Sequence, residues 1–355
     1  MPMHEGIIGW DVGGAHLKAA YLTPDNAIQA VIHLPCPLWR GLAHLEQAIV
    51  QVLSLVGAVA PVHAVTMTGE LVDLFPNRSE GVRLLVSTVV HQLVSTVEQR
   101  LCSQQVWIYG GRRGFLQSRD AVRLADDVAS ANWMASAQYV ASRVEQGLFI
   151  DIGSTTTDIV AFKQGEVCAR GYRDHERLLH EELVYTGVVR TPLMAVTDRV
   201  PVGGDWVPLM AEHFATMADV YRLLGSLPAP MDQAETADGA PKTMEDSARR
   251  LARVVGRDRE SMPIEGWIRL AAYLREMQLQ RIQIACERVL SRGQLEANAP
   301  IVGAGVGRFL AQRLAERMGL QYRDFSECVE AVKDPDWASA CAPAIAVAGL
   351  MRQAL

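Results

Sequence analysis

The fold is decided by the stretch Leu148-Phe149-Ile150-Asp151-Ile152-Gly153-Ser154-Thr155, because a near copy of it, Ile7-Ile8-Gly9-Trp10-Asp11-Val12-Gly13-Gly14, occurs earlier in the chain. Asp11 aligns with Asp151, and the turn glycines align at the same separation of 140 positions. In both copies an apolar strand enters a tight Gly turn and a second apolar run leaves it, which is the pattern of a β-hairpin. The repeat predicts two related halves, each with a hairpin at the equivalent place.

The tips of the two predicted hairpins are candidate phosphate-binding sites. Glycine leaves backbone N–H groups open to close approach by an anion, and strand-end carboxylates such as Asp11 and Asp151 suit Mg²⁺ with part of its water shell. A single such hairpin is more often a structural turn, with Asp11 capping backbone amides and Lys18 exposed on an edge strand. Two copies in register favour a ligand. The predicted phosphate-binding residues are Gly13, Gly14, Lys18, Gly153, Ser154, Thr155 and Thr156.

Two further Gly-rich turns carry candidate binding residues. The turn Gly303-Ala304-Gly305-Val306-Gly307 follows a predicted strand and opens a helix, but its spacing is not that of a dinucleotide fingerprint. Gly303 and Gly305 either hold a ring or a phosphate against the backbone or allow close helix–strand packing, and the two interpretations weigh equally. Arg112 lies in a loop between two glycines, where it suits a diphosphate or is simply solvated.

Three carboxylates are candidates for a catalytic base, in the order Glu70, Asp158 and Asp73. Glu70 and Asp73 come just after a predicted buried strand at 62–67, where the alternative is an acid favoured by a helix dipole. Asp158 follows four consecutive hydroxyl side chains, which suit a polyanion better than a core. Asp158 either orients these groups or acts as the base.

The composition is typical of a soluble cytoplasmic protein. Of 355 residues, 49% are hydrophobic and 21% charged, and the net charge of −6 disfavours a general nucleic-acid or anionic-membrane surface. Six cysteines without a CxxC pair, and no secretory signal before the first strand, favour reduced thiols. No apolar stretch approaches the roughly 20 residues of a membrane span. We expect small-molecule partners, no nucleic acid and no membrane, and leave a homodimer open.

Length and the hairpin repeat predict two domains, at 1–145 and 146–355. The second contains an inserted loop near 226–262, rich in proline and charged residues, and ends in a closing helix at 337–353 with Pro343 inside it. Apolar periodicity also predicts helices at 42–55, 126–144 and 267–290. We expect the closing helix to pack back between the halves.

The paired hairpins and the late Gly-rich turn resemble the superfamily of acetate and sugar kinases, heat-shock ATPases and actin. Within it, the stretch from Asp151 to Asp158 is similar to the hydantoinase/oxoprolinase family. The resemblance implies an α/β fold of two ribonuclease-H-like (actin-like ATPase) domains around a metal–phosphate cleft. Four segments look like the subfamily that accompanies tetrahydromethanopterin-linked one-carbon metabolism, namely 68–76, 131–133, 182–187 and 236–239.

Archaeal members of that subfamily include the synthase that joins an aminomethylfuran diphosphate to γ-glutamyltyramine during methanofuran biosynthesis. The resemblance therefore implies a transferase that forms a methanofuran or methylofuran precursor and releases diphosphate, with Mg²⁺ on Asp11 and Asp151. Two alternatives stay open. One is an ATP-dependent small-molecule kinase of the same superfamily, with ATP or ADP as ligand. The other is a non-catalytic nucleotide-binding partner of one-carbon enzymes.

Overall fold

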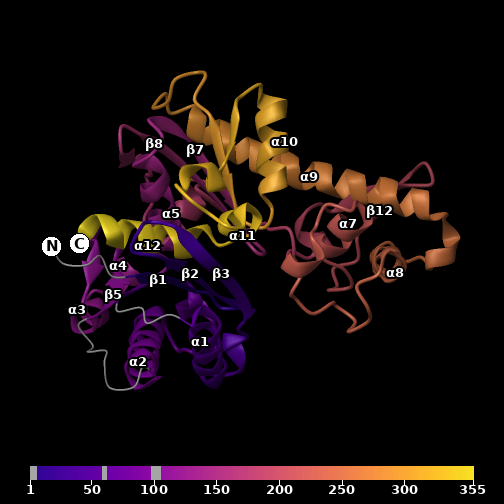
Figure 1. Cartoon of the computed structure of the whole chain (residues 1–355). Coiled ribbons are helices and arrows are strands. Elements are labelled where there is room, and N and C mark those ends of the chain that lie inside the picture. The colour runs from indigo at the N-terminus through magenta and orange to yellow at the C-terminus, as the bar shows by residue number, and fades with distance from the viewer. Residues whose placement is uncertain (1–5, 58–61, 97–104) are drawn as a thin grey trace. The chain divides into compact units, whose positions relative to one another are not determined.

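A computed structural model describes residues 6–57, 62–96 and 105–355 of the chain. The chain forms two compact α/β units, both visible in Figure 1. Unit 1 comprises residues 1–147, 162–176 and 324–355, and unit 2 comprises 148–161 and 177–323. The structure thus groups the chain differently from the predicted single boundary after residue 145. The reason is long-range packing, because the C-terminal helix lies against the N-terminal sheet.

Unit 1 is built on a mixed sheet with the strand order β3-β2-β1-β4-β5-β6. Strand β1 pairs antiparallel with β2 and parallel with β4, so that Asp11 lies beside Lys18 on one side and Thr66 on the other. The first predicted hairpin is confirmed. The strands are β1 Ile7–Val12, β2 His16–Leu22, β3 Ile28–Pro35, β4 Val62–Met67, β5 Val106–Tyr109 and β6 Phe115–Leu116.

Different helices cover the two faces of this sheet. Ile8, Trp10 and Val12 alternate along β1 and join a core that includes buried residues of α1 and α2. The opposite face meets α12, where a Cβ on Gly9 would overlap the Ala344 carbonyl, so glycine permits the close approach. Figure 1 shows α12 and the α1–α2 pair on either side of β1. The helices are α1 Ala43–Val56, α2 Arg78–Thr96, α3 Ser118–Arg123, α4 Ala125–Val128, α5 Asn132–Ala141, α11 Pro335–Ala340 and α12 Ala342–Ala354.

Unit 2 repeats this strand arrangement in its own sheet, of order β10-β8-β7-β13-β14. Strand β7 runs parallel to β13, with Asp151 beside Ala304. When the short strands β6 and β9 are left out, both sheets have the order 3-2-1-4-5 of a ribonuclease-H-like domain, so the predicted fold class is confirmed. The strands of this sheet are β7 Gln146–Ile152, β8 Thr157–Lys163, β10 Leu183–Val184, β13 Ile301–Ala304 and β14 Tyr322–Asp324. β9 Glu166–Val167 also pairs with β8, but β9 and the first half of helix α6 Asp174–Leu179 belong to unit 1.

Between β10 and β13, unit 2 carries an insertion of helices and one hairpin. The predicted loop at 226–262 contains a charged helix, α8, whose Arg250 is fully buried and pairs with Asp219 at 2.8 Å and Asp238 at 3.0 Å. Such a segment folds only because its buried charges are paired. The helix predicted at 267–290 is confirmed. The elements of the insertion are β11 Arg199–Val202, β12 Asp205–Pro208, α7 Met217–Leu223, α8 Met244–Val254 and α9 Ile264–Leu290, and α10 Arg308–Met318 follows β13.

Two predicted helices are interrupted in the structure. The helix expected at 126–144 is divided into α4 and α5, with Ser130 between them at a φ of +52°, a backbone conformation that is rare for a residue other than glycine. The closing helix expected at 337–353 is divided at Cys341 into α11 and α12. Pro343 lies in the first turn of α12, where its missing N–H removes no hydrogen bond. The proline therefore begins a helix instead of interrupting one.

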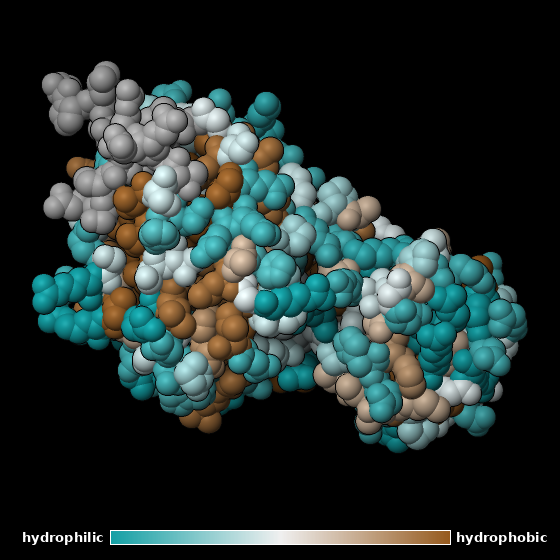
Figure 2. Space-filling view, turned by 90° about the horizontal axis from the view of Figure 1, so that it is seen from below, coloured by the Kyte–Doolittle hydropathy of each residue, from teal (hydrophilic) through white to brown (hydrophobic). Residues whose placement is uncertain are grey.

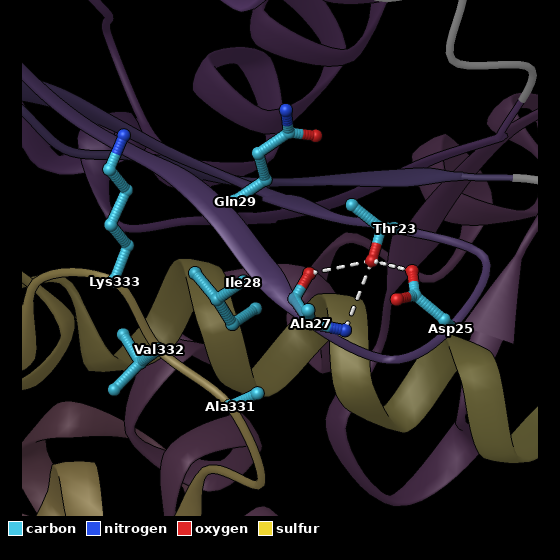
Figure 3. Close-up of a pocket in the computed structure, with 8 residues that line it drawn as sticks. All are labelled: Thr23, Asp25, Ala27, Ile28, Gln29, Ala331, Val332 and Lys333. Atoms are coloured by element: carbon cyan, nitrogen blue, oxygen red, sulfur yellow. Dashed lines mark hydrogen bonds between the residues drawn. The ribbon is translucent and has the colours of Figure 1, made fainter.

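The segment 331–333 covers part of β3, the edge strand of the unit 1 sheet. The Ile28 amide donates to the Ala331 carbonyl at 2.8 Å, and Ile28 forms a parallel bridge with Val332. Covering an edge strand in this way prevents unwanted strand pairing. Figure 3 shows the open pocket of about 490 Å³ beside this contact, with Lys333 and Asp25 at opposite sides.

Apolar side chains also reach the surface of unit 1. Figure 2 shows them gathered among polar ones on the side where α1 and α2 lie, and Val50 and Leu55 of α1 are 43% and 60% exposed. Within the described residues, no helix combines the length and the apolar character required to cross a bilayer.

Candidate functional site

The tip of the first hairpin, in unit 1, is held through its carbonyl groups. The Gly13 amide closes the turn on the His16 carbonyl at 3.0 Å, and the Gly14 and Ala15 carbonyls accept from the amides of Leu38 and Cys36 at 3.0 and 2.8 Å. Within the described part of the chain, the backbone N–H groups of Gly14 and Ala15 donate no hydrogen bond. The turn is therefore fixed while two of its N–H groups are left for an anion.

The tip of the second hairpin, in unit 2, is held in the same way. The Gly153 amide donates to the Thr156 carbonyl at 2.8 Å. The Gly153 and Ser154 carbonyls accept from the segment 188–190 at 2.8 to 3.1 Å. That segment lies so close because a Cβ on Gly187 would overlap the Thr155 amide. Among the described residues, the Ser154 and Thr155 amides have no acceptor either.

Asp11 ends strand β1 as a buried carboxylate with one unsatisfied oxygen. Its Oδ2 lies 3.4 Å from the Lys18 ammonium, whereas Oδ1 is buried without a hydrogen-bond partner in the described chain. Burial raises the pKa of Asp11, and Lys18 and then a hydrogen bond from Asn132 oppose the rise. An orphaned carboxylate oxygen of this kind fits a cation or a metal-bound water.

No group of three His, Cys, Asp or Glu side chains that could hold a metal occurs among the described residues. Mg²⁺ does not require such a cage, because it usually binds through one or two carboxylates, waters and substrate phosphates. Asp11 could therefore bind Mg²⁺ if a phosphate group and water molecules supplied the other ligands of the ion.

Gly305 brings the turn before α10 directly against Asp151. Its φ is +84°, and a Cβ there would overlap both the Ile152 carbonyl and the Asp151 carboxylate. Gly303 likewise packs against the ring of Tyr322. Of the two interpretations of this turn, close packing is what the structure shows. A ligand contact of Gly303 and Gly305 stays a prediction.

Glu70 is a buried carboxylate in the short turn of 3-10 helix that follows β4. Its Oε1 accepts a 2.8 Å hydrogen bond from the Ser130 hydroxyl, and Oε2 is buried without a partner in the described chain. Gly81 allows α2 to pack directly on Glu70, since a Cβ at position 81 would lie within 3 Å of it. Burial raises the pKa of Glu70. A carboxylate of raised pKa is suited to accept a proton near neutral pH.

Residues at the junction of α4 and α5 lie near both Glu70 and Asp11. Ser130 donates to Glu70, and Asn132, the first residue of α5, is near enough to Asp11 to lower its pKa. Ser130 also lies 3.3 Å from Asp174, which pairs with Arg78. Ser130 makes both contacts from a backbone conformation of positive φ.

The other candidate residues have different surroundings. Asp158 in unit 2 pairs with the buried Arg177 at 2.9 Å, and Asp73 is exposed. Arg112 is exposed and stacks on the Tyr172 ring, 5.6 Å from its centroid. Asp11, Lys18 and Glu70 all lie in unit 1, and residues 130–132 come near both carboxylates. Within the described residues, neither Asp73 nor Arg112 forms a hydrogen bond or an ion pair with this group.

The sequence of this chain matches the model of one protein family, described as hydantoinase/oxoprolinase, over residues 62–354. The chain belongs to the hydantoinase/oxoprolinase family. The predicted family is therefore confirmed, and it covers all of unit 2 and most of unit 1.

A curated relative of this hydantoinase/oxoprolinase family member is the (4-{4-[2-(gamma-L-glutamylamino)ethyl]phenoxymethyl}furan-2-yl)methanamine synthase of Methanocaldococcus jannaschii. The two sequences are 31% identical over 300 residues, and the aligned region covers 84% of this chain and 86% of the relative. A synthase of the same name from Methanococcus vannielii is 27% identical over 170 residues, 48% of this chain and 76% of the relative. Nucleotide-free acetone carboxylase is similar in structure, with a TM-score of 0.61 and 13% identity over 96% of this chain and 70% of that one. At that identity the likeness concerns the fold alone.

Four residues of the unit 1 site were missing from the sequence-based candidates: Arg78, Ser130, Asn132 and Asp174. Only Asn132 carried a signal, because it lies in one of the segments that resemble the one-carbon subfamily. Ser130 and Asp174 are 60 and 104 positions from Glu70 and reach the site only through folding. No local pattern marks such residues.

Proposed function

We propose that this protein is a transferase of methanofuran or methylofuran biosynthesis, which condenses an aminomethylfuran diphosphate with a glutamyl-tyramine-type phenol and releases diphosphate. The observation that carries the proposal is the 31% identity over 84% of the chain to a synthase whose name describes a phenoxymethylfuran product. We place the protein in the cytoplasm, in tetrahydromethanopterin-linked one-carbon metabolism, with small molecules as its partners.

The first part of the reaction separates diphosphate from the furanylmethyl carbon. The C–O bond breaks, both of its electrons leave with the diphosphate oxygen, and the hairpin amides and Lys18 stabilise the negative charge. Mg²⁺, when bound, neutralises diphosphate charge as a Lewis acid. Asp11 is the residue that we assign to hold it in unit 1, and Asp151 occupies the equivalent position in unit 2.

The second part forms the ether bond and requires a base. The phenol oxygen bonds to the furanylmethyl carbon and its proton must leave, although an unperturbed phenol has a pKa near 10. Glu70 is the base that we propose, because its buried carboxylate has an oxygen without a partner and a raised pKa. Asp158 is a weaker candidate, since Arg177 already pairs with it, and Asp73 is weaker still because it is exposed.

The decisive experiment mixes the purified protein with furanylmethyl diphosphate, a tyramine derivative and Mg²⁺, omits ATP, and detects the ether product by mass spectrometry. We expect product and diphosphate in equal amounts. Product formation that depends on ATP, or phosphorylation of a small molecule, would instead support a kinase, and the fold shared with the ATP-dependent acetone carboxylase makes ATP the right comparison.

The role of Glu70 has its own prediction. Glu70→Gln keeps the size of the side chain and the hydrogen bond from Ser130, but it removes the base, so kcat should fall by about 10²-fold or more. The affinity for inorganic diphosphate, measured by calorimetry, should stay unchanged. Glu46→Gln, at an exposed glutamate of α1, serves as the matched control, and an equal loss of kcat there would remove Glu70 from this role.

A further inference from the structure

One face of the unit 1 sheet carries side chains beyond Asp11 and Lys18 that the proposed chemistry leaves unused. The register places Asp11 opposite Lys18, and Lys18 opposite His33. Residues directly opposite on paired strands project from the same face, with Cβ atoms about 5 Å apart. A carboxylate, an ammonium and an imidazole therefore follow one another across β1, β2 and β3.

Two more rings extend this row. His16 lies two positions before Lys18 on β2, hence on the same face, and its ring centroid is 4.5 Å from that of His33. The indole of Trp337, from α11, meets His33 edge-on at 5.5 Å. The charged pair Asp11–Lys18 thus continues into a wall of three rings, all of them within unit 1.

The middle ring of this wall is uncharged at physiological pH. Burial, Lys18 and then His16 lower the pKa of His33 to about 2. A neutral imidazole can stack on an electron-rich ring, and it does not repel a positive charge that develops nearby. The face of an indole such as that of Trp337 attracts a cation.

We propose that His16, His33 and Trp337 bind the furan ring of the diphosphate substrate while Lys18 contacts its diphosphate. The inference rests on the proposed transferase function and adds the residues that recognise the ring. When the C–O bond breaks and its electrons leave with diphosphate, the furanylmethyl carbon becomes cationic. It remains so until the phenol oxygen bonds to it and the phenol proton passes to Glu70. The wall lies where it stabilises this intermediate charge.

The test compares a ligand that has the ring with one that lacks it. Trp337→Leu should raise KM for furanylmethyl diphosphate about 10-fold and lower kcat, while the inhibition constant of inorganic diphosphate with Mg²⁺ changes less than about 2-fold. His33→Leu should act in the same direction, and Trp337→Phe should recover most of the loss because it restores an aromatic face. Trp39→Leu, a partly exposed tryptophan of the same unit, is the control.

The outcomes separate the inference from the proposed function. A wild-type protein that forms no ether product overturns the proposed function before any variant is made. If the wild type is active and Trp337→Leu leaves KM unchanged, the three rings are packing alone and the inference is wrong. It is also wrong if KM and the inhibition constant of diphosphate rise equally, because the rings would then serve only to position Lys18.

Discussion

The two hairpins have the same backbone arrangement but differ in the charged side chain on the second strand of each, Lys18 in unit 1 and Asp158 in unit 2. In unit 1, Lys18 lies 3.4 Å from Asp11 and its side chain is 22% exposed. In unit 2, the aligned residue is Asp158, which pairs with the buried Arg177, and Arg177 also donates to the Glu182 carbonyl at 2.8 Å. The first hairpin keeps a cation beside its carboxylate, whereas the second uses the same position for an internal ion pair. A repeat in the sequence therefore predicts a shared geometry but not a shared role.

The largest expected effect tests what the hairpins have in common. Asp11→Asn and Asp151→Asn should each lower kcat/KM by about 10³-fold, because each removes a charge from the diphosphate-binding chemistry. Diphosphate release gives the rate, and Asp25→Asn in the exposed turn after β2 is the control. A large loss in only one of the two variants would show that the hairpins have separate functions.

The next effect tests what differs between them. Arg177→Met removes the cationic partner of a buried ion pair, so the free energy of unfolding should fall by about 3 kcal/mol. Arg288→Met breaks a pair of similar length, 3.1 Å, whose side chains are 48% and 39% exposed. That control should change stability by less than about 1 kcal/mol. Equal losses in urea denaturation would mean that burial does not distinguish the two pairs.

A smaller effect tests the glycine that lies against Asp151. Gly305→Ala should lower the free energy of unfolding by about 2 kcal/mol, because it combines a positive φ with an overlap on Asp151. Gly165→Ala has nearly the same φ, +81°, and nothing within 4 Å of the added Cβ. It should cost only about 1 kcal/mol. If thermal unfolding gives the same loss for both, the contact with Asp151 is unimportant for stability.

The smallest effect concerns Glu70 and pH. The folded pKa of Glu70 is raised by burial, so the stability that it contributes is present below the unfolded pKa of about 4.3 and is lost as pH rises through the folded value. Glu70→Gln cannot ionise. Its free energy of unfolding should therefore rise relative to that of the wild type as the pH increases from 4.5 to 8. Glu80→Gln should show no such gain, because a hydrogen bond from Arg83 lowers the pKa of Glu80. Parallel curves for Glu70→Gln and wild type would contradict the raised pKa.

Much of the fold could be predicted because it depends on local patterns. The Asp-x-Gly hairpins, the buried strand β4 and the long helix α9 follow from apolar periodicity and turn glycines within a few residues. The break at Ser130 could not be predicted, since its positive φ is stabilised by contacts with Glu70 and Asp174 far away in the chain. For the same reason, periodicity did not show that the last helix packs on the first sheet.

The residues of the candidate site also differ in whether the local sequence could indicate them. Asp11, Lys18 and Glu70 could be chosen because each stands at a strand end or turn with a recognisable chemistry. Asn132, Ser130 and the wall of His16, His33 and Trp337 depend on which strands pair and which helix covers them. Histidines and tryptophans have many structural uses, so their types alone do not indicate a substrate ring.

The contact between Gly9 and Ala344 has a consequence for the order in which the protein is made. Strand β1 leaves the ribosome more than 300 residues before α12, the helix that covers its Asp11 face. All strands of the unit 1 sheet are translated by residue 116, but this face of the sheet lacks its cover until α12 follows. Until then the nascent chain exposes an apolar strand face, so chaperone binding should persist until α12 emerges.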